Sequence, residues 1–159
     1  MNKTDLENNL DRVHEWIKSA DQKISIWLAF QGIFLTIVAQ PIVNILKSIK
    51  HIDLRTVIFL ISLILISYSL YKTISAMSPR IKSNKHRSLL YFGDIGSISI
   101  KKYKSKLKNY SDDDLINDLI LQIHISSKIA IKKHKKFNTS LILFITGAVV
   151  LFFVKFFIN

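Results

Sequence analysis

The 159-residue sequence has no cysteine, only four glycines and only two prolines. Because there is no cysteine, the chain forms no disulfide and offers no thiolate to a metal or a substrate. The five histidines are scattered and no nucleophile–base pair is visible, so we expect no metal site, no cofactor and no enzymatic activity. So few glycines and prolines leave little turn chemistry for a sheet-rich fold, and we predict an all-α protein.

Acidic residues are scarce as well, because 11 Asp and Glu face 23 Lys and Arg, which gives a net charge of +12. The surplus is concentrated in residues 78–136, which hold fourteen of the basic residues against five aspartates. A basic chain of this kind suits nucleic acid or the anionic cytoplasmic face of a membrane. Since 49% of the residues are hydrophobic and many lie in long runs, we expect membrane lipid as a partner and no nucleic acid.

Three apolar runs are long enough to predict transmembrane helices, and together they predict an integral membrane helical bundle. The runs cover residues 24–46, 56–77 and 139–158. Pro41 interrupts the first run, where a kink is tolerated, and Pro79 predicts that the second helix ends at or before residue 78.

Three polar side chains lie within the first predicted span, namely Gln31, Gln40 and Asn44. A polar group in hydrocarbon is costly unless it is paired. We therefore expect these side chains to face protein or a polar cavity, and they are candidates for lining a pore.

Residues 4–23 predict an amphipathic helix that continues into the first span. Thr4 and Glu7 have the spacing of a capping box at its start. This stretch is polar and rich in acids, so it is no signal peptide, and insertion must use internal segments. Its apolar seam consists of Leu6, Leu10, Val13, Ile17, Ala20 and Ile24. The seam packs within the chain or in a coiled coil between copies, and we expect a homo-oligomer.

A second soluble helix leads into the last span. Ser111 and Asp114 form a second predicted capping box, while residues 80–110 predict a loop with one or two short helices. We expect a seam along this helix that consists of Ile116, Ile120, Ile123, Ser127, Ala130, His134 and Phe137. The whole chain, residues 1–159, is then a single domain in which the two soluble helices form a cytoplasmic stalk.

Several charged groups have two interpretations. The lysines of residues 101–108 and the cluster of Arg80, Lys82, Lys85 and Arg87 suit either an anion site or a solvated or lipid-facing surface. Asp21 and Lys23 mark the membrane interface, or Asp21 pairs with a base such as Lys128.

Two stretches of the chain resemble a known family. The first is residues 12–23, which include Trp16, Asp21 and Lys23 and run directly into the first span. The second begins at residues 91–95, with Phe92, Gly93 and Asp94, and continues to His124, Lys128 and a basic helix that enters the last span. In this order around three spans, the motifs resemble the Pycsar transmembrane effectors, the membrane-embedded killer proteins of a bacterial antiphage system.

The resemblance covers about residues 10–154 and implies a function that composition does not show. In that family a pyrimidine cyclase makes a cyclic mononucleotide on phage infection, and the effector then impairs the inner membrane, which leads to abortive infection. The resemblance implies that this chain is such an effector, and we take as candidate ligand-binding residues Arg80, Lys82, Lys85, Arg87, Phe92, Asp94 and Lys128. The chain has no room for a cyclic-nucleotide domain of the β-roll kind, so it senses a cyclic nucleotide directly, senses it through a partner protein, or responds to another messenger.

A function of another class stays open. The charged pattern beside the N-terminal seam also suits a non-toxic membrane scaffold or subunit, which binds a partner protein through its cytoplasmic helices.

Charge predicts the orientation in the membrane. Three crossings place the N-terminal helix and residues 78–136 on one side and the C-terminus on the other. The fourteen basic residues of 78–136, against three in residues 47–55, favour the cytoplasm for the first side. We therefore expect a multi-pass protein of the bacterial inner membrane with a cytoplasmic N-terminus and a periplasmic C-terminus.

Because the chain has no cysteine, single introduced cysteines test this orientation cleanly. A cysteine in place of Asn159 should react with a membrane-impermeant thiol reagent added to whole cells, and one in place of Ser105 should react only after the cells are broken. The reverse labelling pattern would contradict the predicted orientation.

Overall fold

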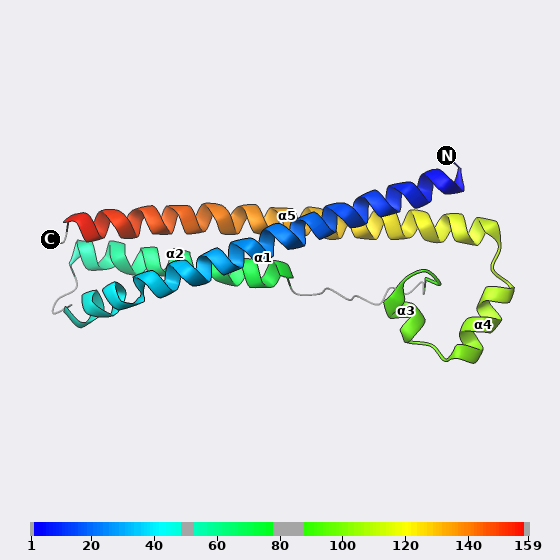
Figure 1. Cartoon of the computed structure of the whole chain (residues 1–159), viewed down its shortest axis with the longest axis horizontal. Coiled ribbons are helices and arrows are strands. Elements are labelled where there is room, and N and C mark those ends of the chain that lie inside the picture. Colours follow the sequence, from blue (N-terminus) through cyan, green and yellow to red (C-terminus); the bar gives the residue numbers. More distant parts are fainter. Residues whose placement is uncertain (1, 49–52, 78–87, 158–159) are drawn as a thin grey trace. The chain divides into compact units, whose positions relative to one another are not determined.

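The computed structural model describes residues 2–48, 53–77 and 88–157, without the side chains of residues 48, 92 and 155–157. Within these ranges the chain forms five helices and no strand (Figure 1): α1 (Lys3–Ser48), α2 (Leu54–Met77), α3 (Phe92–Gly96), α4 (Ile100–Lys108) and α5 (Asp112–Phe157). The helices α1, α2 and α5 are each long and apolar enough to cross a membrane. The prediction of an all-α protein with three such helices is confirmed.

The start of α1 is fixed by a reciprocal pair of hydrogen bonds. The backbone N–H of Asn2 donates to Asp5 Oδ2 at 3.0 Å, and the N–H of Asp5 donates to Asn2 Oδ1 at 2.8 Å. The predicted capping box at Thr4 and Glu7 is therefore wrong by two residues. Asn2 is as good an N-cap residue as Thr4, and hydropathy does not choose between overlapping caps.

The predicted capping box of α5 is confirmed. The N–H of Asp114 donates to Ser111 Oγ at 3.1 Å, and the N–H of Ser111 donates to Asp114 Oδ2 at 3.1 Å. The Ser111 hydroxyl and N–H stabilise the carboxylate and lower the pKa of Asp114. At the start of α2, Asp53 is the capping residue, because its Oδ1 accepts the backbone N–H of Thr56 at 2.8 Å.

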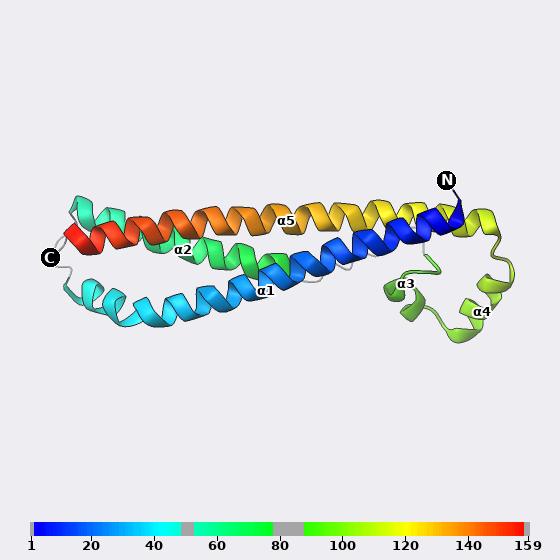
Figure 2. The ribbon, with the colours of Figure 1, turned by 45° about the horizontal axis from the view of Figure 1, so that its top comes forward.

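The chain divides into two compact units, and the helices α1 and α5 each contribute to both. The first unit comprises Met1–Ser19 and Pro79–Ile131, and the second comprises Ala20–Ser78 and Lys132–Asn159. In the first unit, α1 and α5 lie side by side (Figures 1 and 2). Leu6 and Val13 of α1 are buried there, which agrees with the predicted seam.

The predicted seam of α5 is confirmed at Ala130 but is wrong over most of its length in the first unit. Ile120, which was expected to be buried, is 50% exposed, whereas Leu119 is 3% exposed. The buried positions along this part of the helix are Asp118, Leu119, Gln122, Ser126 and Ala130. Several of these buried side chains are polar. The predicted seam, which was based mainly on isoleucines, therefore lies on a neighbouring face of the helix.

In the second unit, α2 packs with one continuous face. Its buried residues recur at alternating spacings of three and four: Phe59, Ser62, Ile66, Ser69, Thr73 and Ala76. This is the spacing of a coiled-coil seam. The apolar core of the unit joins α2 to α5 through Phe59, Ile66, Phe144, Leu151 and Val154. Partly buried side chains of α1, including Phe34 and Ile45, pack against this core.

A glycine allows α2 and α5 to approach closely. A Cβ added to Gly147 would lie 2.9 Å from Ile66 Cγ1 and 3.1 Å from the backbone oxygen of Ser62. Both distances are shorter than ordinary van der Waals contacts, so a larger side chain would push the two helices apart.

We predict that Gly147→Leu destabilises the second unit by about 1–3 kcal/mol because of this clash. The matched control is Gly32→Leu in α1, where nothing lies within 4 Å of an added Cβ. The control should leave stability unchanged or raise it by up to about 1 kcal/mol, since leucine is a better helix former than glycine. Thermal unfolding of the detergent-solubilised proteins measures both, and equal effects of the two changes would contradict the close approach.

Candidate functional site

The motif at residues 91–94 forms the start of α3 and the turn before it. Asp94 is buried, and its Oδ2 accepts the backbone N–H of Ser88 at 3.0 Å. A Cβ at Gly93 would lie 2.7 Å from Tyr91 Cε1, so glycine leaves the space that the Tyr91 ring occupies. The carboxylate of Asp94, a predicted ligand-binding group, is thus bound by the chain itself, while the side chain of Phe92 lies outside the described residues.

A second buried carboxylate, Asp118 of α5, also accepts hydrogen bonds from the turn before α3. Its Oδ2 accepts the hydroxyl of Ser88 at 2.8 Å, the N–H of Leu89 at 3.0 Å and the hydroxyl of Tyr110 at 2.8 Å. Burial, together with the hydrogen bond to Asp118 and its charge, raises the pKa of Tyr110 above the ordinary value of 10.0. Asp118 therefore joins α5 to the segments before α3 and after α4.

The basic candidates in the first unit lie on its surface. Lys128 and His124 of α5 are exposed, and so is Trp16 of α1, at 55%. None of the nine residues of α4 is buried, and five of them are lysines. Among the candidates, Arg80, Lys82, Lys85 and Arg87 lie outside the described residues.

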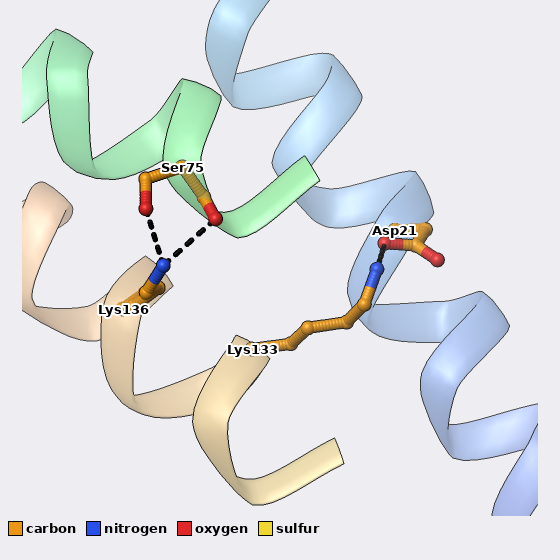
Figure 3. A network of polar contacts seen from close by, with 4 residues as sticks. All are labelled: Asp21, Ser75, Lys133 and Lys136. Atoms are coloured by element: carbon orange, nitrogen blue, oxygen red, sulfur yellow. Dashed lines mark hydrogen bonds and ion pairs between the residues drawn. The ribbon is translucent and has the colours of Figure 1, made fainter. Parts of the chain in front are cut away.

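In the second unit, two lysines of α5 contact the other two long helices (Figure 3). Lys133 forms an ion pair with Asp21 of α1. Lys136 donates to the backbone oxygen of Ser75 in α2 at 2.8 Å and also to the Ser75 hydroxyl. A lysine at the carboxyl end of α2 satisfies a terminal carbonyl and suits the helix dipole. The partner of Asp21 is thus Lys133, five residues beyond the predicted Lys128, while Lys23 is exposed.

A polar layer lies in the interior of the second unit, and we define it as Gln31, Ser69, Thr73 and Ser140, which are each at most 1% exposed. Ser140 Oγ is its centre. It lies 2.9 Å from Ser69 Oγ and 2.6 Å from Thr73 Oγ1, and it accepts the indole N–H of Trp27 at 3.1 Å. Gln31 Nε2 donates to Ser69 Oγ at 2.7 Å. The layer therefore joins all three long helices by hydrogen bonds.

The structure does not bring the three predicted pore-lining residues together. Gln31 is buried in the polar layer, whereas Gln40 and Asn44 are exposed. Gln40 Nε2 donates to Asn44 Oδ1 at 3.2 Å, one turn further along the same face of α1. Gln40 follows Gln31 by nine residues, which is about 900° of rotation, or two and a half turns of α-helix. Gln40 therefore lies on the opposite face of α1 from Gln31.

Sequence reasoning missed most of the groups that organise the two units, namely Ser88, Tyr110, Asp118 and Ser140. A signal was present for the serines of the spans, because Ser62, Ser69 and Ala76 follow one another at heptad spacing. A small polar residue at heptad spacing in a span indicates a face packed on protein. No comparable pattern marks Asp118.

Among the residues that the structure describes, no group of three or more His, Asp and Glu side chains is placed to hold a metal ion. Fold and site together define a helical membrane protein whose buried polar groups bind one another.

Comparison with known proteins identifies the family. The profile of the Pycsar effector protein domain matches residues 5–158, so the chain belongs to the Pycsar effector family. It is 28% identical to the Pycsar effector protein GmPycTM of Gulbenkiania mobilis, over 86% of this chain and 82% of the relative. It is 27% identical to the Pycsar effector protein PtPycTM of Propioniciclava tarda, over 90% of this chain and 73% of the relative. No solved structure matches the chain. Membership of the family implies an effector role in antiphage defence.

The raised pKa of Tyr110 predicts a specific pH dependence. A group whose pKa is raised on folding contributes stability below its unfolded pKa, near 10, and the contribution is lost as the pH rises towards the folded value. At neutral pH, Tyr110→Phe should cost about 1–2 kcal/mol, because the buried Asp118 loses one donor. Above about pH 10 the difference between wild type and variant should shrink.

Denaturation followed by circular dichroism between pH 7 and 11 measures this difference. Tyr103→Phe, which removes the same hydroxyl from α4, is the control and should track wild type at every pH. A Tyr110→Phe variant as stable as wild type at neutral pH would contradict the role of the Tyr110–Asp118 hydrogen bond.

Proposed function

We propose that this chain is a membrane effector of nucleotide-signalled antiphage defence. A cyclic nucleotide made on infection activates it, and the activated protein impairs the inner membrane and causes abortive infection. The observation that supports this most is the family match over residues 5–158, because it includes the soluble helices and all three apolar helices together. Two relatives that match most of the chain carry the same name of Pycsar effector protein.

The signal is received in the basic segment, residues 78–136. A cyclic nucleotide presents a phosphate anion, which clustered cations bind well. The exposed lysines of α4 and Lys128 supply positive charge on the first unit. We place the nucleotide at the cluster of Arg80, Lys82, Lys85 and Arg87, and a sensor partner protein bound to this segment is the other route for the signal.

Charge asymmetry supports the orientation of the effector. With the basic segment in the cytoplasm, the nucleotide site faces the compartment in which a cyclase acts. The C-terminus then lies in the periplasm, and the protein is a multi-pass protein of the inner membrane.

Activation changes the packing of the spans. The helices α1 and α5 each continue without a break between the soluble segments and the apolar segments, so a change in the soluble part can alter the spans through the backbone. A nucleotide drives such a change only by its difference in affinity for the two states. We propose that the active state is a homo-oligomer.

Cells that produce this chain with a pyrimidine cyclase, in the presence of a membrane-potential dye, test the proposal. We expect loss of potential when the cyclase is active and none with an inactive cyclase. The variant with Arg80, Lys82, Lys85 and Arg87 all changed to Ala should keep the potential.

The matched control changes Lys101, Lys102, Lys104 and Lys108 to Ala, which removes the same charge from exposed positions of α4. It should still respond to the cyclase. An intact potential in the wild type at full induction would contradict the proposed function and favour a scaffold role, whereas loss of response in both variants would contradict the placement of the site.

A further inference from the structure

The interior between α1, α2 and α5 in the second unit has a polar part and an apolar part. Along α5, Lys133 and Lys136 come first, with partners on α1 and α2, and Ser140 follows in the polar layer. One turn beyond Ser140 comes Phe144, which begins the apolar core. Polar groups therefore reach inward from the basic end of the spans as far as Ser140, where the apolar core begins.

One atom of the polar layer has no hydrogen-bond partner. Gln31 Oε1 is buried without a donor, although the side chain is only 1% exposed. The neighbouring hydroxyls already have acceptors, since Ser69 Oγ donates to the backbone oxygen of Ser140 at 2.7 Å and Ser140 Oγ to that of Ser69 at 3.0 Å. A buried acceptor without a donor is costly, and a bound water is its usual partner.

The hydroxyl oxygens beside this atom lie within hydrogen-bond distance of one another. Thr73 Oγ1 and Ser140 Oγ are 2.6 Å apart, and Ser140 Oγ and Ser69 Oγ are 2.9 Å apart. Ser69 Oγ then accepts from Gln31 Nε2 at 2.7 Å. For a proton to pass, each hydroxyl proton must first rotate from its backbone oxygen toward the next hydroxyl. A proton taken up at one end then releases another at the far end, and the hydroxyls rotate back before the next proton passes.

An apolar barrier lies beyond these hydroxyls. The ring of Phe144 is 5.2 Å from that of Trp27, 5.8 Å from that of Phe30 and 4.9 Å from that of Phe34, measured between centroids. Beyond it the next buried hydroxyl of α2 is Ser62, which donates to the backbone oxygen of Phe59. Ser62 and Ser69 are seven residues apart on α2, which is about 10 Å of helix. An apolar constriction in a conduction path blocks conduction until it is wetted.

We propose that the interior of a single chain conducts protons through the hydrated polar layer, and that Phe144 is the gate. This inference rests on the proposed function. It identifies protons as the ion that crosses the impaired membrane and the polar layer as the path that they take. Displacement of the Phe144 ring lets water join the polar layer to Ser62, and protons then cross. The exposed face of Gln40 and Asn44 is the competing path, which would run between copies.

Purified protein in liposomes with an internal pH dye and a potassium-valinomycin potential tests the path, with cyclic CMP or cyclic UMP as the activating probe. We expect the probe to start proton uptake by the wild type. Ser140→Ala should slow the uptake about tenfold or more, which corresponds to about 1.4 kcal/mol. The control Ser67→Ala, at an exposed position of α2, should conduct like the wild type.

Phe144→Ala should conduct protons without any nucleotide. The matched control is Phe153→Ala, which removes a ring that is 56% exposed and should not conduct without nucleotide. Thermal unfolding shows whether Phe144→Ala is folded. Should it be unfolded, Ser140→Cys replaces it, since its thiol should react with a small charged thiol reagent only when the nucleotide is present.

The outcomes separate the two proposals. Proton uptake that is equal in Ser140→Ala and wild type would overturn the proton path and leave the membrane effector standing, as would uptake stopped only by changes at Gln40 and Asn44. Conduction by Phe144→Ala when the wild type ignores both nucleotides would support the path and contradict activation by a cyclic pyrimidine nucleotide. No flux from any variant would overturn both.

Discussion

A polar group inside a membrane-spanning bundle must find its partner within the protein, and the second unit depends on this constraint. Ser140 meets it by contacting Ser69 and Thr73 of α2 and the indole of Trp27 on α1. These bonds are short only if the three helices are close, and Gly147 supplies the room for that approach. The packing of the three long helices is therefore specified by a polar layer as well as by the apolar core.

The same constraint organises the first unit with carboxylates in place of hydroxyls. Asp94 and Asp118 are buried, and both accept hydrogen bonds from the segment that begins at Ser88. They fix the turn before α3 and the position of Tyr110, so their role is to shape the unit. Four of the five lysines of α4, namely Lys101, Lys102, Lys104 and Lys108, are exposed and are available to an anion. In this unit the buried aspartates therefore fix the local structure, and the exposed lysines carry positive charge on its surface.

Much of the fold was predictable because its signals are local. Long apolar runs predicted the three spanning helices, Pro79 predicted the end of α2, and Ser111 predicted the start of α5. The sequence did not predict the features that depend on which face of a helix is buried. The seam of α5 passes through polar residues such as Asp118, so apolar periodicity misplaced it. The partner of Asp21 likewise depends on how two helices pack across 112 residues of sequence.

The most direct test of this account is a double-mutant cycle between Gln31 and Ser69, whose side chains on different helices are 2.7 Å apart. The free energy of unfolding in bicelles is measured for wild type, Gln31→Leu, Ser69→Ala and the double variant. If the polar layer holds the spans together, the two changes should be coupled by at least about 0.6 kcal/mol. Effects that add to within about 0.3 kcal/mol would contradict the central role of the polar layer.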